Sequence, residues 1–99
     1  MELKTEKNGT ELTVALSGEL NTLTAPELSA LLDAELPGMQ VLTLDFEGCE
    51  YVSSAGLRVL LATFKQMKVA KGSMELTNVG ENFKDVLQNT GLDAVFGVF

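Results

Sequence analysis

Two adjacent serines, Ser53 and Ser54, stand immediately before a run of residues with helical periodicity. The first turn of a helix leaves backbone N–H groups without partners, and a serine hydroxyl can accept a hydrogen bond from them. That end of a helix also carries a partial positive charge, which favours an anion. A phosphate on Ser54 would be tolerated there, and Arg58, one turn further on, could pair with it. The residues alone leave both roles open, a helix cap and a modification site.

Three carboxylates, Asp45, Glu47 and Glu50, precede the serines and are of the type that acid–base or metal chemistry uses. Histidine is absent from the chain, which removes the commonest general base and the commonest neutral metal ligand. The glycines are too scattered for a phosphate-binding loop. We therefore expect no catalytic residues, no metal site and no cofactor, and we do not expect an enzyme.

These residues belong to two segments, 18–28 and 45–61, that each connect a predicted strand to a predicted helix. Alternation, turn signals and helical spacing predict strands at 2–6, 11–17, 41–46, 73–77 and 95–99, and helices that open at Thr24, open at Ser53 or Ser54, and span 81–90. The order β-β-α-β-α-β-α-β predicts an α/β fold: one domain, residues 1–99, with a mixed sheet and helices mainly on one face. Ligands and partners usually dock at strand-to-helix loops of such sheets.

Caps and spacing also predict where the helices end and which side chains they bury. Thr24, with Glu27 three residues later, predicts a capping box. Gly72 is expected to end the second helix. The side chains expected to face the core are Leu28, Leu31, Leu32 and Leu36 in the first helix, Leu57, Leu60, Leu61 and Phe64 in the second, and Phe83, Val86 and Leu87 in the third.

Composition narrows the classes of partner. The chain has 99 residues, 45% of them hydrophobic, and a net charge of −7. This charge argues against nucleic acid and suits a basic protein partner, or solubility alone. No apolar run approaches the roughly 20 residues of a membrane span, and the N-terminus lacks the run of a signal peptide, so we expect no membrane insertion and a cytoplasmic location. The single cysteine, Cys49, is expected in the core.

The run Tyr-Val-Ser-Ser-Ala-Gly-Leu at residues 51–57 resembles the signature of STAS domains, specifically of bacterial anti-sigma factor antagonists. Gly-Glu-Leu at 18–20, with Thr24 and Ala25, resembles the first conserved loop of that family. Residues 65–68 and 90–92 are also similar. The resemblance covers nearly the whole chain, and its order of elements agrees with the order predicted from the patterns.

The resemblance implies a phosphorylation switch that regulates sigma-dependent transcription. In the family, a protein kinase that is also the anti-sigma factor phosphorylates a serine at the place of Ser54. The unphosphorylated antagonist binds that kinase and frees the sigma factor; phosphorylation breaks the complex, and a serine phosphatase restores it. The residues then expected to contact the partner are Glu19, Asn21, Thr22, Thr24, Glu50, Ser53, Ser54, Gly56, Leu57 and Arg58.

The sequence departs from the family pattern at two positions beside this site. Ser53 and Asn21 stand where family members often have aspartate, and both changes remove negative charge. They could alter kinase selectivity or mean that phosphorylation has been lost, and Ser53 is itself an alternative acceptor. The alternative function is therefore a STAS accessory subunit of a transporter or signalling complex, which binds its partner without phosphorylation.

Overall fold

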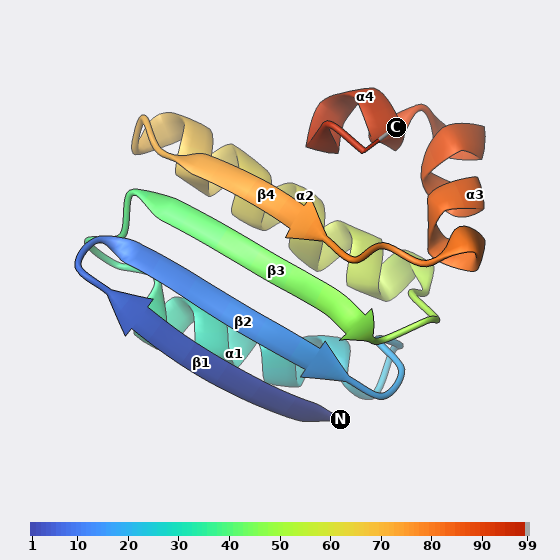
Figure 1. Ribbon diagram of the computed structural model, residues 1–99, viewed down its shortest axis with the longest axis horizontal. Helices are drawn as coiled ribbons and strands as arrows, with labels where there is room; N and C mark the ends of the chain where they lie inside the picture. Colours follow the sequence, from blue (N-terminus) through green and yellow to red (C-terminus); the bar gives the residue numbers. More distant parts are fainter. Residues whose placement is uncertain (99) are drawn as a thin grey trace.

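The computed structural model describes residues 1–98 and contains one four-stranded sheet with the strand order β1-β2-β3-β4 (Figure 1). The strands are β1 (Glu2–Asn8), β2 (Glu11–Ser17), β3 (Val41–Gly48) and β4 (Ser73–Thr77). The helices are α1 (Ala25–Glu35), α2 (Ser54–Val69), α3 (Glu81–Thr90) and α4 (Leu92–Phe96). β1 and β2 form an antiparallel hairpin, whereas β2–β3 and β3–β4 are parallel. The predicted mixed sheet is confirmed.

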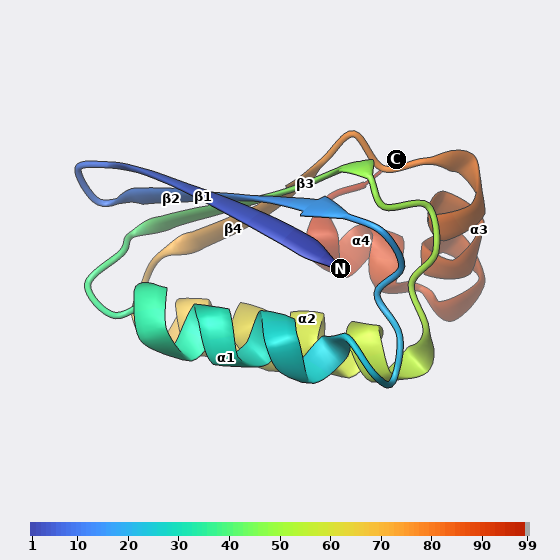
Figure 2. The ribbon, with the colours of Figure 1, turned by 90° about the horizontal axis from the view of Figure 1, so that it is seen from below.

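The helices lie on one side of the sheet, as predicted. Figure 2 shows α1 and α2 side by side beneath it, with α3 and α4 toward one end. Leu12, Val14 and Leu16 of β2 are buried, whereas the residues between them are half-buried and belong to the other face. Because successive side chains of a strand point to opposite faces, this alternation directs the apolar face of β2 toward the helices. No helix covers the opposite face among the residues that the structure describes.

The last predicted strand, 95–99, is wrong: residues 92–96 form the short helix α4, and residue 99 lies outside the described residues. Gly91 (φ +77°) and Gly97 (φ +68°) bracket this helix in the left-handed conformation that glycine adopts at low cost. The turn places the ring of Phe96 edge-on to that of Phe64, with centroids 5.7 Å apart. The observed order is therefore β-β-α-β-α-β-α-α.

The end of α2 also differs from the prediction. The left-handed residue that follows the helix is Lys71 (φ +58°), not Gly72. A Cβ atom at Gly72 would lie 2.6 Å from the carbonyl oxygen of Gln40. Gly72 is therefore needed where the chain passes close to the segment before β3. The sequence alone did not distinguish this role of glycine from that of a residue that ends a helix.

The buried face of α2 is rotated from the predicted one. Its buried residues are Gly56, Leu60, Thr63 and Met67. Of the four predicted side chains only Leu60 is buried; the other three are half-buried. The predicted set held only large apolar residues, whereas a glycine and a threonine are also buried on this helix. In α1 the prediction holds for Leu28 and Leu32, and it holds for Leu36, the C-cap of this helix, while Leu31 is half-buried.

Candidate partner-binding site

Two loops meet at the carboxyl ends of β2 and β3: the first loop, residues 18–24, and the second loop, residues 49–53. The backbone N–H of Leu20 donates to the carbonyl oxygen of Tyr51 at 2.9 Å, and the N–H of Ser53 donates to the carbonyl oxygen of Leu20 at 2.8 Å. These bonds continue the parallel pairing beyond the sheet. The two loops therefore form one backbone-bonded surface at the carboxyl ends of the parallel strands, where ligands and partners usually dock.

The side chains beneath this surface are tightly packed. Leu20 is fully buried and Val52 nearly so. A Cβ atom at Gly56 would lie 2.8 Å from Cγ of Leu20 and 3.0 Å from Cγ1 of Val52. Gly56, predicted as a contact residue, is thus buried, and its role in this structure is to let the start of α2 approach both loops.

Asn21 and Thr24 shape the first loop from within. Oδ1 of Asn21 accepts hydrogen bonds from the N–H groups of Leu23 (2.9 Å) and Thr24 (3.1 Å). Oγ1 of Thr24 donates to the carbonyl oxygen of Glu19 at 2.6 Å and accepts from the N–H of Asn21 at 2.8 Å. The predicted capping box is wrong, because the Thr24 hydroxyl is engaged with the preceding loop and caps no helix N–H. An aspartate at position 21 would offer the same acceptor, so Asn21 preserves this geometry without the charge.

The two serines have different surroundings. Ser53 is the N-cap of α2, and its Oγ accepts from the N–H of Gly56 at 3.4 Å, a long hydrogen bond. Ser54 is the first helical residue and is exposed, and its hydroxyl has no hydrogen-bond partner within residues 1–98. Arg58, one turn later, is also exposed. The cap is therefore Ser53, which leaves the Ser54 hydroxyl accessible to a partner.

Exchange of each serine for alanine should separate these roles. Ser53→Ala is expected to lower the free energy of unfolding by about 0.5–1 kcal/mol. This value is at the low end of the cost of losing an N-cap, because the cap hydrogen bond is long. Ser54→Ala should stay within about 0.5 kcal/mol of the natural protein, since the Ser54 side chain is exposed. Urea denaturation of the two variants measures both values. A larger loss for Ser54→Ala than for Ser53→Ala would contradict the assignment of the cap.

The remaining predicted contact residues differ in exposure. Glu19, Thr22 and Glu50 are exposed, and Leu57 is half-buried. The contact residues named from the sequence did not include Leu23 and Tyr51, although both lie in the segments 18–28 and 45–61; their side chains are 84% and 53% exposed. The signal that could have identified them was a large apolar or aromatic residue within an otherwise polar loop.

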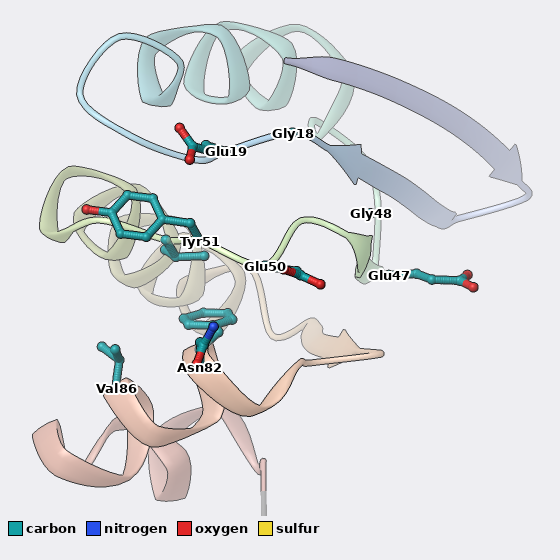
Figure 3. Close-up of a pocket in the computed structure, with 10 residues that line it drawn as sticks. Gly18, Glu19, Glu47, Gly48, Glu50, Tyr51, Asn82 and Val86 are labelled. Atoms are coloured by element: carbon teal, nitrogen blue, oxygen red, sulfur yellow. The ribbon is translucent and has the colours of Figure 1, made fainter.

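A groove of about 650 Å³ separates the second loop from α3 (Figure 3). The residues that line it are Gly18, Glu19, Glu47, Gly48, Glu50, Tyr51, Val52, Asn82, Phe83 and Val86. Val86, predicted to face the core, is 36% exposed at this groove, whereas Phe83 and Leu87 are buried as predicted. Helical spacing assigned Val86 to the inner stripe, but the loops do not close over that edge of α3.

The carboxylates considered for metal or acid–base chemistry do not converge. Oδ1 of Asp45 accepts hydrogen bonds from the side chain of Asn78 (2.9 Å) and the backbone N–H of Glu47 (3.0 Å). Within residues 1–98, no three Asp, Glu or Cys side chains are grouped so as to hold a metal ion. None of the helices in this part of the chain is both long and apolar enough to span a membrane.

Cys49 lies beneath the second loop and is fully buried, as predicted. Its Sγ is 3.5 Å from the carbonyl oxygen of Tyr51. Burial raises the pKa of the Cys49 thiol, because the thiolate would lose its hydration there. Hydrogen bonding with the backbone of Leu20 and Tyr51 offsets this effect in part. The thiol is therefore expected to stay protonated and unreactive in the folded protein.

The raised pKa of Cys49 predicts a pH dependence of stability. The unfolded thiol, with a pKa of about 8.5, deprotonates before the folded one. Above that pH the unfolded state binds fewer protons than the folded state, so the stability that Cys49 contributes is lost as pH rises toward its folded pKa. The difference in unfolding free energy between the natural protein and Cys49→Ala should therefore shrink between pH 8 and pH 10. A constant difference over this range would contradict a raised pKa.

Known proteins are similar to this chain over nearly its full length. A family model described as "Mlab, STAS domain" matches residues 3–97. BtrV of Bordetella bronchiseptica, named as an anti-sigma factor antagonist, is 32% identical over 99% of this chain and 85% of its own. The anti-sigma-B factor antagonist of Bacillus subtilis is 28% identical over 94% of this chain and 85% of its own. The crystal structure of an anti-sigma factor antagonist from Mycobacterium paratuberculosis superposes with a TM-score of 0.84 at 27% identity, covering 96% of this chain and 81% of the other. Because the family model matches residues 3–97 and BtrV is 32% identical over nearly the whole chain, the chain belongs to the STAS domain family.

Proposed function

We propose that this protein is an anti-sigma factor antagonist: it binds an anti-sigma factor that is also a serine kinase, and phosphorylation of Ser54 releases it. The observation that carries this proposal is the division of roles at the start of α2, where Ser53 caps the helix and Ser54 exposes its hydroxyl. The names of the similar relatives support the same class of function. Its consequence in the cell is regulation of sigma-dependent transcription in the cytoplasm.

The chemistry of the switch belongs to the kinase. Oγ of Ser54 forms a bond to the γ-phosphorus of ATP, the bond from that phosphorus to the bridging oxygen breaks, ADP leaves, and the hydroxyl proton passes to a base of the kinase. The phosphate adds about 1.5–2 negative charges. The N-terminus of α2 accommodates this charge within the free antagonist, and Arg58 is close enough in sequence to pair with it. A serine phosphatase would reverse the step.

The two loops are the proposed contact surface. Their exposed side chains include Glu19, Thr22 and Glu50. Asn21, Thr24 and Gly56 support the surface by holding the loop and helix backbones. A partner bound here would cover the Ser54 hydroxyl, so a phosphate on that atom would have to be buried in the contact.

Site mapping by mass spectrometry after incubation with a candidate kinase and ATP tests this function. We expect one added phosphate on Ser54, retained in Ser53→Ala and absent from Ser54→Ala. Phosphate on Ser53 instead would move the switch by one residue and contradict the assignment. If an active kinase binds the protein but adds no phosphate, the alternative of a non-phosphorylated accessory subunit would replace the proposal.

A further inference from the structure

The groove between the second loop and α3 combines an apolar floor with partly exposed aromatic and aliphatic side chains. Val52 and Phe83 form buried parts of its lining, with Phe83 only 1% exposed. Tyr51 and Val86 remain accessible on opposite sides, as Figure 3 shows. An accessible tyrosine next to apolar surface is typical of protein interfaces, where aromatic residues are enriched. The groove therefore has the make-up of a docking surface.

The charge of the groove is uniformly negative. Glu19, Glu47 and Glu50 lie along it, and no lysine or arginine is among the residues that line it. Within residues 1–98 the ion pairs are Lys4–Glu2 and Lys7–Glu35, so none of the three groove carboxylates has a cation of this chain as its partner. Negative potential at this position disfavours nucleotides and other anions and favours a cation. A second copy of the chain would also be repelled, since each carries a net charge of −7.

We propose that the groove binds an arginine of the anti-sigma factor, together with an apolar side chain beside it; this inference rests on the proposed function. A guanidinium group can stack on the ring of Tyr51, and the carboxylates of Glu19 and Glu50 supply the negative potential that attracts it to the groove. It is also less strongly hydrated than the ammonium group of lysine, which favours a partly apolar groove. The neighbouring apolar side chain would pack against Val86.

This occupant extends the interface to a part of the molecule that the sequence signature does not include. α3 follows β4 in the chain, yet Asn82, Phe83 and Val86 bring it to the same groove as the second loop. The groove also differs in function from Ser54, because it supplies affinity in the unphosphorylated state. No serine or threonine lines it, and the hydroxyl of Tyr51 is the only one among its lining residues.

The test measures the affinity of the natural protein and of groove variants for the anti-sigma factor kinase at low and high salt. Glu19→Gln with Glu50→Gln should weaken binding roughly tenfold and reduce its salt dependence, which corresponds to about 1.4 kcal/mol. Tyr51→Leu should weaken binding severalfold, whereas Tyr51→Phe retains the stacking ring and most of the affinity. Val86→Arg should also weaken binding, because it places a cation in the groove that competes with the partner's arginine for the carboxylates.

The control is Glu11→Gln with Glu75→Gln, which makes the same change of net charge at two exposed positions that alternate with buried strand residues. It should leave affinity within twofold of the natural value. Equal binding by natural protein, groove variants and control would overturn the groove assignment while leaving the Ser54 switch intact. If the natural protein does not bind the kinase, the proposed function fails and the groove assignment fails with it. A change in self-association of the groove variants, measured by sedimentation, would instead identify a second copy as the occupant.

Discussion

Phosphorylation at Ser54 is expected to weaken binding to the anti-sigma factor about a hundredfold. Ser54 is exposed in the free protein and lies beside the two loops that we assign to the contact. A phosphate dianion buried between two proteins loses hydration and adds to the negative charge of Glu19 and Glu50. A loss of about 3 kcal/mol from these effects corresponds to a hundredfold change in affinity. Calorimetric titration of the kinase with phosphorylated and unphosphorylated antagonist measures it directly.

Reversal provides the control for this measurement. Treatment of the phosphorylated protein with a serine phosphatase should restore the original affinity, which excludes damage during phosphorylation as the cause. Ser54→Asp should give a smaller loss, because a carboxylate brings one charge and two oxygens instead of a phosphate dianion with three. Affinities that agree within twofold for both forms would show that Ser54 phosphorylation is not the switch.

Leu20→Ala is expected to cost about 2–5 kcal/mol of unfolding free energy, the range for large-to-small changes in a packed core. Leu20 belongs to a loop, yet its side chain is fully buried and fills the space against Gly56. Loss of the side chain leaves a cavity under both loops. Urea and thermal denaturation measure the effect, and binding to the kinase should weaken as well because the loops lose their support.

Leu23→Ala is the matched control, with the same substitution three residues away in the same loop. Leu23 is 84% exposed, so its truncation should change stability by no more than about 0.5 kcal/mol. A similar loss of stability for both variants would contradict the structural difference between these leucines.

The sequence predicted most of the fold because its strands and longer helices have clear periodicity. Leu12, Val14 and Leu16 alternate over a whole strand, and the helix at 81–90 has the predicted bounds. Periodicity could not predict the structure of residues 92–98. A short apolar run such as 95–99 fits either a strand or a helix, and the packing of Phe96 on Phe64, which no local pattern specifies, accompanies the helix.

The place of Ser53 and Ser54 at the start of a helix was predictable, but the structural role of each serine was not. The signature and the strand-to-helix loops located Ser53 and Ser54, but only the hydrogen bond to Gly56 N–H identifies the cap. Val86 lines the groove because the long-range packing of α3 leaves that side chain partly exposed. Such roles depend on which segments approach one another in space, and residue spacing within one helix does not predict those contacts.

The backbone bonding between the two loops separates the support of this surface from its outward side chains. The loops are joined by main-chain groups, and the supporting side chains, such as Leu20 and Asn21, point inward or into the loop itself. The outward side chains, such as Thr22, Leu23 and Tyr51, contribute little to holding this framework. Their identities can therefore change without refolding the protein. On the proposed function, exchange of a few of these surface residues should yield antagonists that each bind one kinase and not another.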